Sequence, residues 1–360
     1  MAVKRKLLLV DYYGICDEKH RPIGHSQKVL QEYAELIKDS FNITVAVSPC
    51  LMNGLDNKFD KIILLKYDII EDGKKTLWDR IKDKFKLFYN IKEVMREKEY
   101  DVIWFYRTDF FLFFYFFLRI KYKRNKMPIF GLLYQEDFGG GRLSPLLTYF
   151  FRKGALKFDG LMYTQKGMVQ FHPNILWLPD YYYDENKYKK YQGTKKCKTA
   201  VCLGTMNPFK KLEELVDVFN ENGLDLEIKG YFYEKDRFQK LKKKKKENIL
   251  IEDVILSEDE YYRALAEAKY SILPYDIEQY GCRTSGVLLE SLFLNTIPVA
   301  PKELLRENDI EGIGYESLTE LSDSAWIEKN KQKTEINLNI HFDKSNIKHR
   351  LISFINQENL

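Results

Sequence analysis

Cysteine is scarce in this sequence, with 5 residues in 360, and no pair has the spacing of a metal-binding or redox motif. The nearest two, Cys197 and Cys202, stand at the wrong spacing for a zinc knuckle or a CxxC pair. An odd number of cysteines without such pairing is typical of reduced thiols inside the cell. We therefore expect a cytoplasmic protein without a bound metal; the other cysteines are Cys16, Cys50 and Cys282.

Long apolar runs are also missing, because no stretch reaches the roughly 20 apolar residues that a membrane-spanning helix needs. The apolar run before Asp11 is short and has no small-residue cleavage site, so we expect a first strand there and not a signal peptide. The aromatic run from Phe110 to Leu118 is followed by several basic residues. It fits either a buried helix with a basic exit or a peripheral contact with an anionic bilayer.

The sequence lacks a strong charge of either sign. Its 58 basic and 53 acidic residues leave a net charge of +5, too small and too dispersed for a nucleic-acid-binding face. An anionic substrate, or weak attraction to an anionic membrane surface, is compatible with it. Apolar residues make up 45% and charged residues 31%, which is typical of a globular chain, and 360 residues are enough for two domains.

Short apolar runs alternate with helix-length segments along the first half. A polar loop follows the first run, and Ser26 can then cap a helix whose apolar residues recur at helical spacing. This alternation predicts an α/β domain with a parallel sheet and helices on both faces. The expected strands are residues 6–11, 43–47, 61–65, 101–106, 127–134 and 159–163.

The second half repeats the same rhythm and predicts a second doubly wound α/β domain. Its expected strands are residues 199–203, 226–228, 249–251, 270–273 and 297–300, and its clearest helices are residues 209–219, 258–268 and 285–293. A Tyr-, Lys- and Asp-rich segment with little periodicity separates the halves and reads as a linker. We expect Rossmann-like domains over residues 1–180 and 199–340, the linker over 181–198, and a last helix within 341–360.

A turn with a glycine and a lysine follows the first strand of the second domain. Gly204 allows close backbone approach, Pro208 suits the first turn of a helix, and Lys210 can meet an anion at this helix N-terminus. In doubly wound sheets, ligands bind beyond the carboxyl ends of the strands. An ordinary strand-to-helix turn with surface lysines is the alternative.

A second candidate site precedes the helix at residues 285–293. The backbone amides of Thr284, Ser285 and Gly286 and the helix dipole can bind an anion, and Arg283 adds a positive charge. Glu290 then stands inside an apolar helix, where an ionised carboxylate is costly unless it is paired. The two hydroxyls of a ribose would be natural partners. A partly exposed glutamate on the outer helix face is the alternative.

The ordered series of these segments resembles the C-terminal domain of GT-B glycosyltransferases. More specifically, it resembles the large bacterial retaining group known as glycosyltransferase family 4, or group 1. The resemblance covers about 100 residues. It is carried by residues 204–211, 256–268, 271–275, 285–290 and 295–300. It implies two facing Rossmann-like domains with a C-terminal helix that crosses back to the first.

The resemblance also implies roles for individual residues. Lys210 would neutralise the donor diphosphate, and Glu290 would bind the ribose hydroxyls. The backbone amides of Ser285, Gly286 and Val287 would contact the distal phosphate or the sugar. The chain departs from the family at two positions: Thr205 stands where an arginine usually follows the glycine, and Cys282 stands where the first of two glutamates is usual. Gly204, Thr205 and Arg283 complete the expected donor-binding set, with Arg283 as a replacement for the missing arginine.

In the first domain, two loops can carry acceptor and catalytic groups. Gly24 and His25 stand in the loop after the first strand, where they could approach the donor phosphates. Asp137, or its neighbour Glu136, follows the strand expected at residues 127–134 and could orient an acceptor hydroxyl or act as a base. A loop with solvated acids is the alternative for the second of these segments.

The expected function is transfer of a glycosyl unit from a nucleotide-diphosphate sugar, UDP- or GDP-linked, to a hydroxyl of a sugar or lipid-linked glycan. The resemblance implies a retaining, metal-independent hexosyltransferase of cell-surface polysaccharide synthesis, without a cofactor, and with its site between the two domains. We expect no nucleic-acid partner, and a cytoplasmic location with peripheral contact at the inner face of the membrane as an open extension. A non-catalytic GT-B partner subunit and a sugar-nucleotide epimerase on the same fold are the alternatives.

Overall fold

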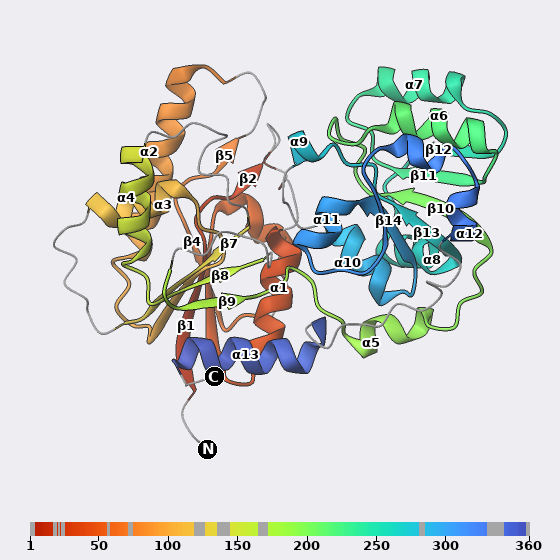
Figure 1. Ribbon diagram of the computed structural model, residues 1–360. Coiled ribbons are helices and arrows are strands. Elements are labelled where there is room, and N and C mark those ends of the chain that lie inside the picture. The colour runs from red at the N-terminus through yellow and green to blue at the C-terminus, as the bar shows by residue number, and fades with distance from the viewer. Residues whose placement is uncertain are drawn as a thin grey trace. The chain divides into compact units, whose positions relative to one another are not determined.

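The computed structural model describes residues 4–16, 20, 22, 26–55, 58–70, 75–118, 127–134, 145–164, 172–280, 285–329 and 342–357. These residues form two compact units (Figure 1). The N-terminal unit contains the described residues up to 164, residues 172–179 and residues 345–357. The C-terminal unit contains the described residues between 180 and 344.

The N-terminal unit is built on a parallel sheet in which β1 (Arg5–Asp11) lies between β3 (Phe41–Val47) and β6 (Val102–Phe105). Residues 7–10 of this strand are fully buried, because helices cover both faces of the sheet and leave no side for solvent. The strand order is β4 (Lys61–Leu64), β3 (Phe41–Val47), β1, β6 (Val102–Phe105), β7 (Ile129–Leu133), β8 (Gly160–Tyr163) and β9 (Ile175–Trp177). A separate short pair joins β2 (Ile15–Cys16) to β5 (Ile69–Ile70).

The helices of this unit follow from capping and apolar spacing. A capping box between Thr76 and Asp79 begins the longest of them. The last helix packs on the sheet, where Phe354 lies 5.4 Å from the ring of Phe130 and would clash with any side chain at Gly160. The helices are α1 (Ser26–Ile37), η1 (Pro49–Gly54), α2 (Leu77–Val94), α3 (Phe110–Leu118), α4 (Pro145–Ala155) and α13 (Lys344–Asn356).

The aromatic run at residues 110–118 forms helix α3, which packs closely on α4. Phe113 and Phe116 are fully buried, and a Cβ at Gly154 of α4 would meet the Phe113 carbonyl at 1.8 Å. The buried helix expected for this run is therefore present. Within the part of the chain that the structure describes, no helix is long and apolar enough to span a bilayer.

The C-terminal unit repeats the architecture with six parallel strands (Figure 1). Their order is β12 (Ile249–Asp253), β11 (Leu226–Gly230), β10 (Lys198–Leu203), β13 (Ala268–Ile272), β14 (Ile297–Pro301) and β15 (Ile313–Tyr315). Each βα connection returns to a neighbouring parallel strand except the one from β12 through α8 to β13, which crosses back over β11 and β10, as in dinucleotide-binding folds. The helices are α5 (Glu185–Tyr188), η2 (Lys189–Tyr191), α6 (Leu212–Asn222), α7 (Lys235–Lys244), α8 (Glu258–Glu267), α9 (Ile277–Tyr280), α10 (Gly286–Phe293), α11 (Lys302–Glu307), η3 (Leu318–Leu321) and α12 (Ala325–Lys329).

Two expectations differ from the structure in detail. The helix expected from Phe209 begins only at Leu212, because the backbone of Lys210 pairs with Tyr275 in an isolated bridge and keeps the preceding residues in a loop. The short strands β2, β5, β9 and β15 were not expected. With two or three residues each, they are too short to show a repeating pattern.

Candidate functional site

The candidate site lies where the C-terminal sheet changes winding direction. Strand β10 is flanked by β11 on one side and by β13 on the other, so the connections diverge at its carboxyl end. Open α/β sheets bind ligands at such a point. Here the segment after β10 carries Gly204, Thr205 and Lys210, and the helix after β13 and α9 carries Ser285 to Glu290.

Gly204 brings three of the expected residues together. Its φ of +92° lies in the left-handed region, which side-chain-bearing residues rarely adopt. A Cβ at this position would lie 3.5 Å from Cγ2 of Val287 and 4.0 Å from Nζ of Lys210. Gly230, at the end of β11, is equally constrained, because a Cβ there would lie 1.6 Å from the Gly204 carbonyl oxygen. The backbone turn after β10 thus faces both the lysine and the start of α10.

Lys210 is buried, with 3% of its surface exposed. Its Nζ donates to the Leu203 carbonyl at 2.8 Å and lies 3.9 Å from Sδ of Met206. Among the residues that the structure describes, no carboxylate forms an ion pair with it, and burial lowers the pKa of its ammonium group. A buried charge without a counter-ion is costly. An anionic ligand at this position would therefore be strongly favoured.

The loop that carries Lys210 is held by its neighbours on both sides. The amide of Lys211 donates to the Pro274 carbonyl at 2.7 Å, and Arg237 of α7 donates to the Asn207 and Lys210 carbonyls at 2.9 and 2.6 Å. Arg237 also forms an ion pair with Glu213. The sequence reasoning missed Arg237, because one arginine in a basic helix carries no distinguishing pattern.

The N-terminus of α10 forms the opposite part of the site. Ser285 is the N-cap, and its Oγ accepts from the Leu288 amide and lies 3.1 Å from the Tyr275 hydroxyl. Tyr275 in turn has its ring 5.8 Å from Nζ of Lys210. At the next residue, Gly286, a Cβ would lie 2.9 Å from the Tyr181 ring, so a larger residue would require that ring to shift. A capped helix start with nearby positive charge is suited to an anion.

Glu290 lies one turn further along α10 and is 4% exposed, so it does not stand on an outer helix face. Its two carboxylate oxygens accept from the hydroxyls of Tyr261 and Tyr262, at 2.8 and 3.0 Å. Burial, and next the negative charge of Glu290, raises the pKa of both tyrosines. An ionised carboxylate can accept about four hydrogen bonds, so tyrosine donors and ligand hydroxyls can share it.

The structure therefore brings Gly204, Lys210 and Val287 together and joins Ser285 to them through Tyr275. Thr205 and Gly286 are their neighbours in the chain, and Glu290 lies one turn further along α10; all seven belong to the C-terminal unit. Gly24, His25, Asp137 and Arg283 lie outside the described residues, as do Glu136 and Cys282. The partners Tyr261, Tyr262 and Tyr275 were missed, since tyrosine is abundant throughout this chain.

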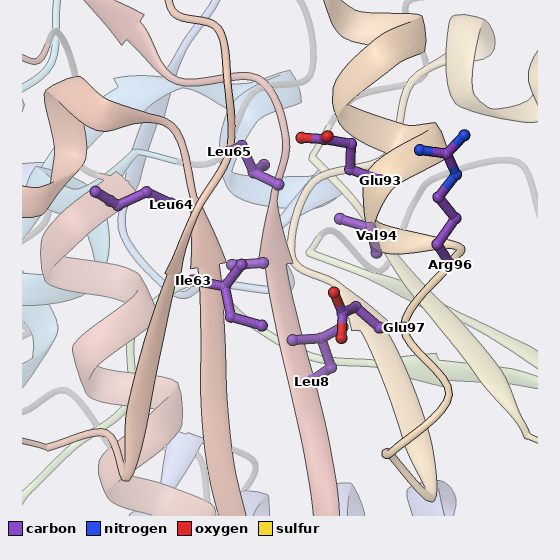
Figure 2. A pocket seen from close by; sticks show the side chains of 9 residues that line it. Leu8, Ile63, Leu64, Leu65, Glu93, Val94, Arg96 and Glu97 are labelled. Carbon is purple, nitrogen blue, oxygen red and sulfur yellow. The ribbon is translucent and has the colours of Figure 1, made fainter.

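A pocket in the N-terminal unit contains none of the expected site residues. It has a volume of about 210 Å³ and lies between β1, β3 and β4 and the end of α2. Figure 2 shows Leu8, Ile63 and Leu65 on the strand side, with Glu93, Arg96 and Glu97 on the helix side. Two glutamates against one arginine do not suit a diphosphate. The pocket is also smaller than the roughly 300 Å³ at which ligand sites usually begin.

Comparison with solved structures identifies the fold. AviGT4, a glycosyltransferase involved in avilamycin A biosynthesis, is 13% identical with a TM-score of 0.57, over 98% of this chain and 97% of that chain. Alr3699/HepE of Anabaena, solved with UDP, is 14% identical with a TM-score of 0.63, over 98% and 100%. Sucrose-phosphate synthase of Thermosynechococcus elongatus is 11% identical with a TM-score of 0.61, over 98% and 95%. This chain has the GT-B fold. No protein-family model and no curated protein matches it in sequence.

Proposed function

We propose that this chain is a glycosyltransferase that uses a nucleotide-diphosphate sugar as donor and binds that donor in its C-terminal unit. One observation carries the proposal. Lys210 is a buried cation without a described carboxylate partner, and Gly204, Val287 and the capped start of α10 lie beside it. The site thus presents positive charge and backbone amides at the switch point of the sheet, where a diphosphate would bind.

Each expected donor contact has a chemical role in this proposal. Lys210 neutralises the diphosphate as it leaves, and the amides of Gly286 and Val287 stabilise its oxygens. Glu290, oriented by two tyrosines, accepts from the ribose hydroxyls. Thr205 lies next to Gly204 at the same turn, and Arg283 would add a second charge. A lysine, an arginine and a helix N-terminus can supply the charge stabilisation that a metal provides elsewhere, so we assign no metal to the transfer step.

The finer assignments extend this proposal. The resemblance supports a retaining transfer to a hydroxyl of a sugar or lipid-linked glycan, in cell-surface polysaccharide synthesis. The complexes of Alr3699/HepE with UDP and with UDP-glucose make UDP the first nucleotide to test, with GDP second. We assign acceptor binding to the N-terminal unit, with Gly24, His25 and Asp137 as candidates, and a cytoplasmic location with peripheral membrane contact.

A non-catalytic GT-B partner subunit is the second candidate function. The observation that favours it is the pair of departures at Thr205 and Cys282, where the resembled family has an arginine and a glutamate. Such a subunit could keep the nucleotide site and lose turnover. A sugar-nucleotide epimerase would need acidic and histidine groups around the sugar, and none is assigned here.

The test is calorimetric titration of the full chain with UDP, GDP, ADP and CMP. We expect one nucleoside diphosphate to bind saturably, and Glu290→Ala to weaken it at least tenfold, about 1.4 kcal/mol. The control is Glu303→Ala, an exposed glutamate on α11 of the same unit, which should bind as the wild type does. Tyr261→Phe removes one hydrogen bond to Glu290 but keeps the carboxylate that would bind the ligand. Its nucleotide affinity should therefore fall less than that of Glu290→Ala, whereas a loss of affinity caused by misfolding around Glu290 would appear in both variants.

Three results would separate the candidates. Binding by none of the nucleotides, or equal binding by a folded Glu290→Ala, contradicts the donor site. Binding followed by transfer from the matching nucleotide sugar supports the glycosyltransferase, whereas a changed but untransferred sugar supports the epimerase. Binding without turnover under any acceptor condition supports the partner subunit.

A further inference from the structure

Four side chains with metal-binding chemistry come from three separate stretches of the N-terminal unit: Cys16 and His20, then Cys50, then Asp68. Sγ of Cys16, Nδ1 of His20 and one carboxylate oxygen of Asp68 all lie within 4.8 Å of one another. The thiol of Cys50 is buried nearby and interacts with both Asp68 and Cys16, but it does not lie within 4.8 Å of all three of those atoms. Two thiols, an imidazole and a carboxylate are the ligand types that Zn²⁺ takes in proteins.

The two distances from His20 are close to those of a tetrahedral site. Nδ1 of His20 lies 3.3 Å from Oδ2 of Asp68 and 4.0 Å from Sγ of Cys16. Around one zinc ion with ordinary bond lengths, the first separation would be about 3.3 Å and the second about 3.6 Å. Small side-chain rotations would therefore bring these atoms to binding distance.

The surroundings of the ligand atoms also fit a metal site. The Cys50 amide donates to Oδ1 of Asp68 at 2.9 Å, which leaves Oδ2 as the oxygen directed at His20. In metal sites of other proteins, a hydrogen bond of this kind to the second oxygen orients the carboxylate that binds the metal. Cys16 belongs to β2, which pairs with β5 directly after Asp68, so the sheet itself brings these two ligands together.

The four residues come from three segments at one edge of the sheet. Cys16 and His20 follow β1, Cys50 stands in η1 after β3, and Asp68 follows β4. A shared ion would join these three loops at the carboxyl ends of their strands, which is the ligand-binding edge of a doubly wound sheet. His25, one of the candidate catalytic residues, follows His20 by five positions in the sequence.

We propose that Cys16, His20, Cys50 and Asp68 form a structural zinc site that joins the loop after β1 to the loops after β3 and β4. The two thiols bind as thiolates and release their protons to solvent, and the imidazole binds as the neutral ring. Four protein ligands close the coordination sphere, so the ion has a structural role and takes no part in glycosyl transfer. The proposal is independent of the donor site in the C-terminal unit.

The test uses the full chain, reduced and stripped of metal, titrated with Co²⁺ and then with Zn²⁺. We expect one Co²⁺ per chain, with thiolate-to-cobalt charge-transfer absorption and the visible bands of tetrahedral cobalt, and displacement by one Zn²⁺. Removing a group that only orients a metal ligand weakens metal binding by about 10- to 100-fold. Removing a ligand itself should cost more, so we expect Cys16→Ser and Cys50→Ser each to weaken metal binding by at least about 100-fold. His20→Ala should also weaken binding, and we expect it to fold because the His20 side chain is 61% exposed.

Cys197→Ser is the matched control, because Cys197 is an exposed free thiol in the other unit and should leave metal binding unchanged. Far-ultraviolet circular dichroism of each variant checks that it is folded. The proposal is wrong if the reduced wild type takes up no stoichiometric Co²⁺ or Zn²⁺. It is also wrong if the Cys16, Cys50 and His20 variants bind as tightly as the wild type, or if Cys16 and Cys50 form a disulfide in protein purified with reductant.

Discussion

Replacing Lys210 by methionine separates a ligand-binding role from a structural one. The ammonium group is buried, donates to one carbonyl, and has no carboxylate partner among the described residues. Methionine keeps the length and apolar character of the side chain and removes the charge. The substitution loses the hydrogen bond to the Leu203 carbonyl but also ends the cost of burying an unpaired cation, and these two effects oppose each other. We therefore expect the free energy of unfolding to change by no more than about 1 kcal/mol.

The effect on ligand binding should be much larger. A hydrogen bond to a charged group contributes about 1.5–3 kcal/mol, so Lys210→Met should weaken diphosphate binding by roughly 10- to 150-fold. Ligand at 100 times the wild-type dissociation constant stabilises the wild type by about 2.7 kcal/mol. The same concentration should stabilise Lys210→Met by only about 0.3–1.4 kcal/mol. Urea unfolding with and without UDP or GDP measures both quantities.

Lys211→Met is the matched control, since Lys211 is the exposed neighbour and undergoes the same chemical change. It should resemble the wild type in both stability and ligand response. Two results would refute the reasoning. If Lys210→Met binds the diphosphate as tightly as the wild type does, the lysine does not contact it. If Lys210→Met loses more than about 3 kcal/mol without ligand, the lysine belongs to a buried structural pair.

Two further changes test the C-terminal unit. Burial lowers the pKa of Lys196 to about 8, against about 10.4 in the unfolded chain. Between these two pH values the unfolded state binds more protons than the folded state. The free energy of unfolding should therefore rise with pH across that window. Allowing for partial exposure of Lys196, this rise is on the order of 1 kcal/mol. Urea unfolding of Lys196→Met should show a smaller rise across the same pH window. An equal rise in the wild type and the variant would contradict the lowered pKa. Arg237→Ala should weaken diphosphate binding about tenfold, because the carbonyl of Lys210 loses its donor, while Lys240→Ala on the exposed side of α7 should have no effect in the same calorimetric titration. Unchanged affinity in Arg237→Ala would show that the loop is held without it.

Much of the architecture could be predicted because parallel strands are read from continuous apolar runs. Strand β10 and helix α10 fall within two residues of the expected ranges, since each combines an apolar run with a clear terminal signal. The sequence singles out Lys210 by its place after a strand and a glycine turn, and Glu290 as an acidic residue in an apolar helix; the structure buries both, and their roles stay predictions. The start of α6 at Leu212 could not be read, because it depends on the pairing of Lys210 with Tyr275 across the site.

The parts that could not be predicted depend on contacts between distant segments. Tyr261 meets Glu290 across 29 positions, and Arg237 reaches the Lys210 carbonyl across 27. The proposed cluster of Cys16, His20, Cys50 and Asp68 shows the same limit, since only Cys16 and His20 are close in the sequence and the other two come from separate loops. The expectation of no metal stays a prediction, and the zinc proposal departs from it because sequence rules recognise ligands that are close along the chain. Those rules do not recognise cysteines that come together only in the folded structure.

Hydrogen–deuterium exchange of the full chain, with and without saturating UDP or GDP, tests the central claim most directly. The account predicts that the diphosphate slows exchange in two segments of the C-terminal unit, the loop at residues 203–211 and the helix at residues 285–294, and that Lys210→Met loses this protection. Protection confined to other segments, such as the pocket beside β4 and α2, would contradict the donor site. So would unchanged exchange at every nucleotide concentration.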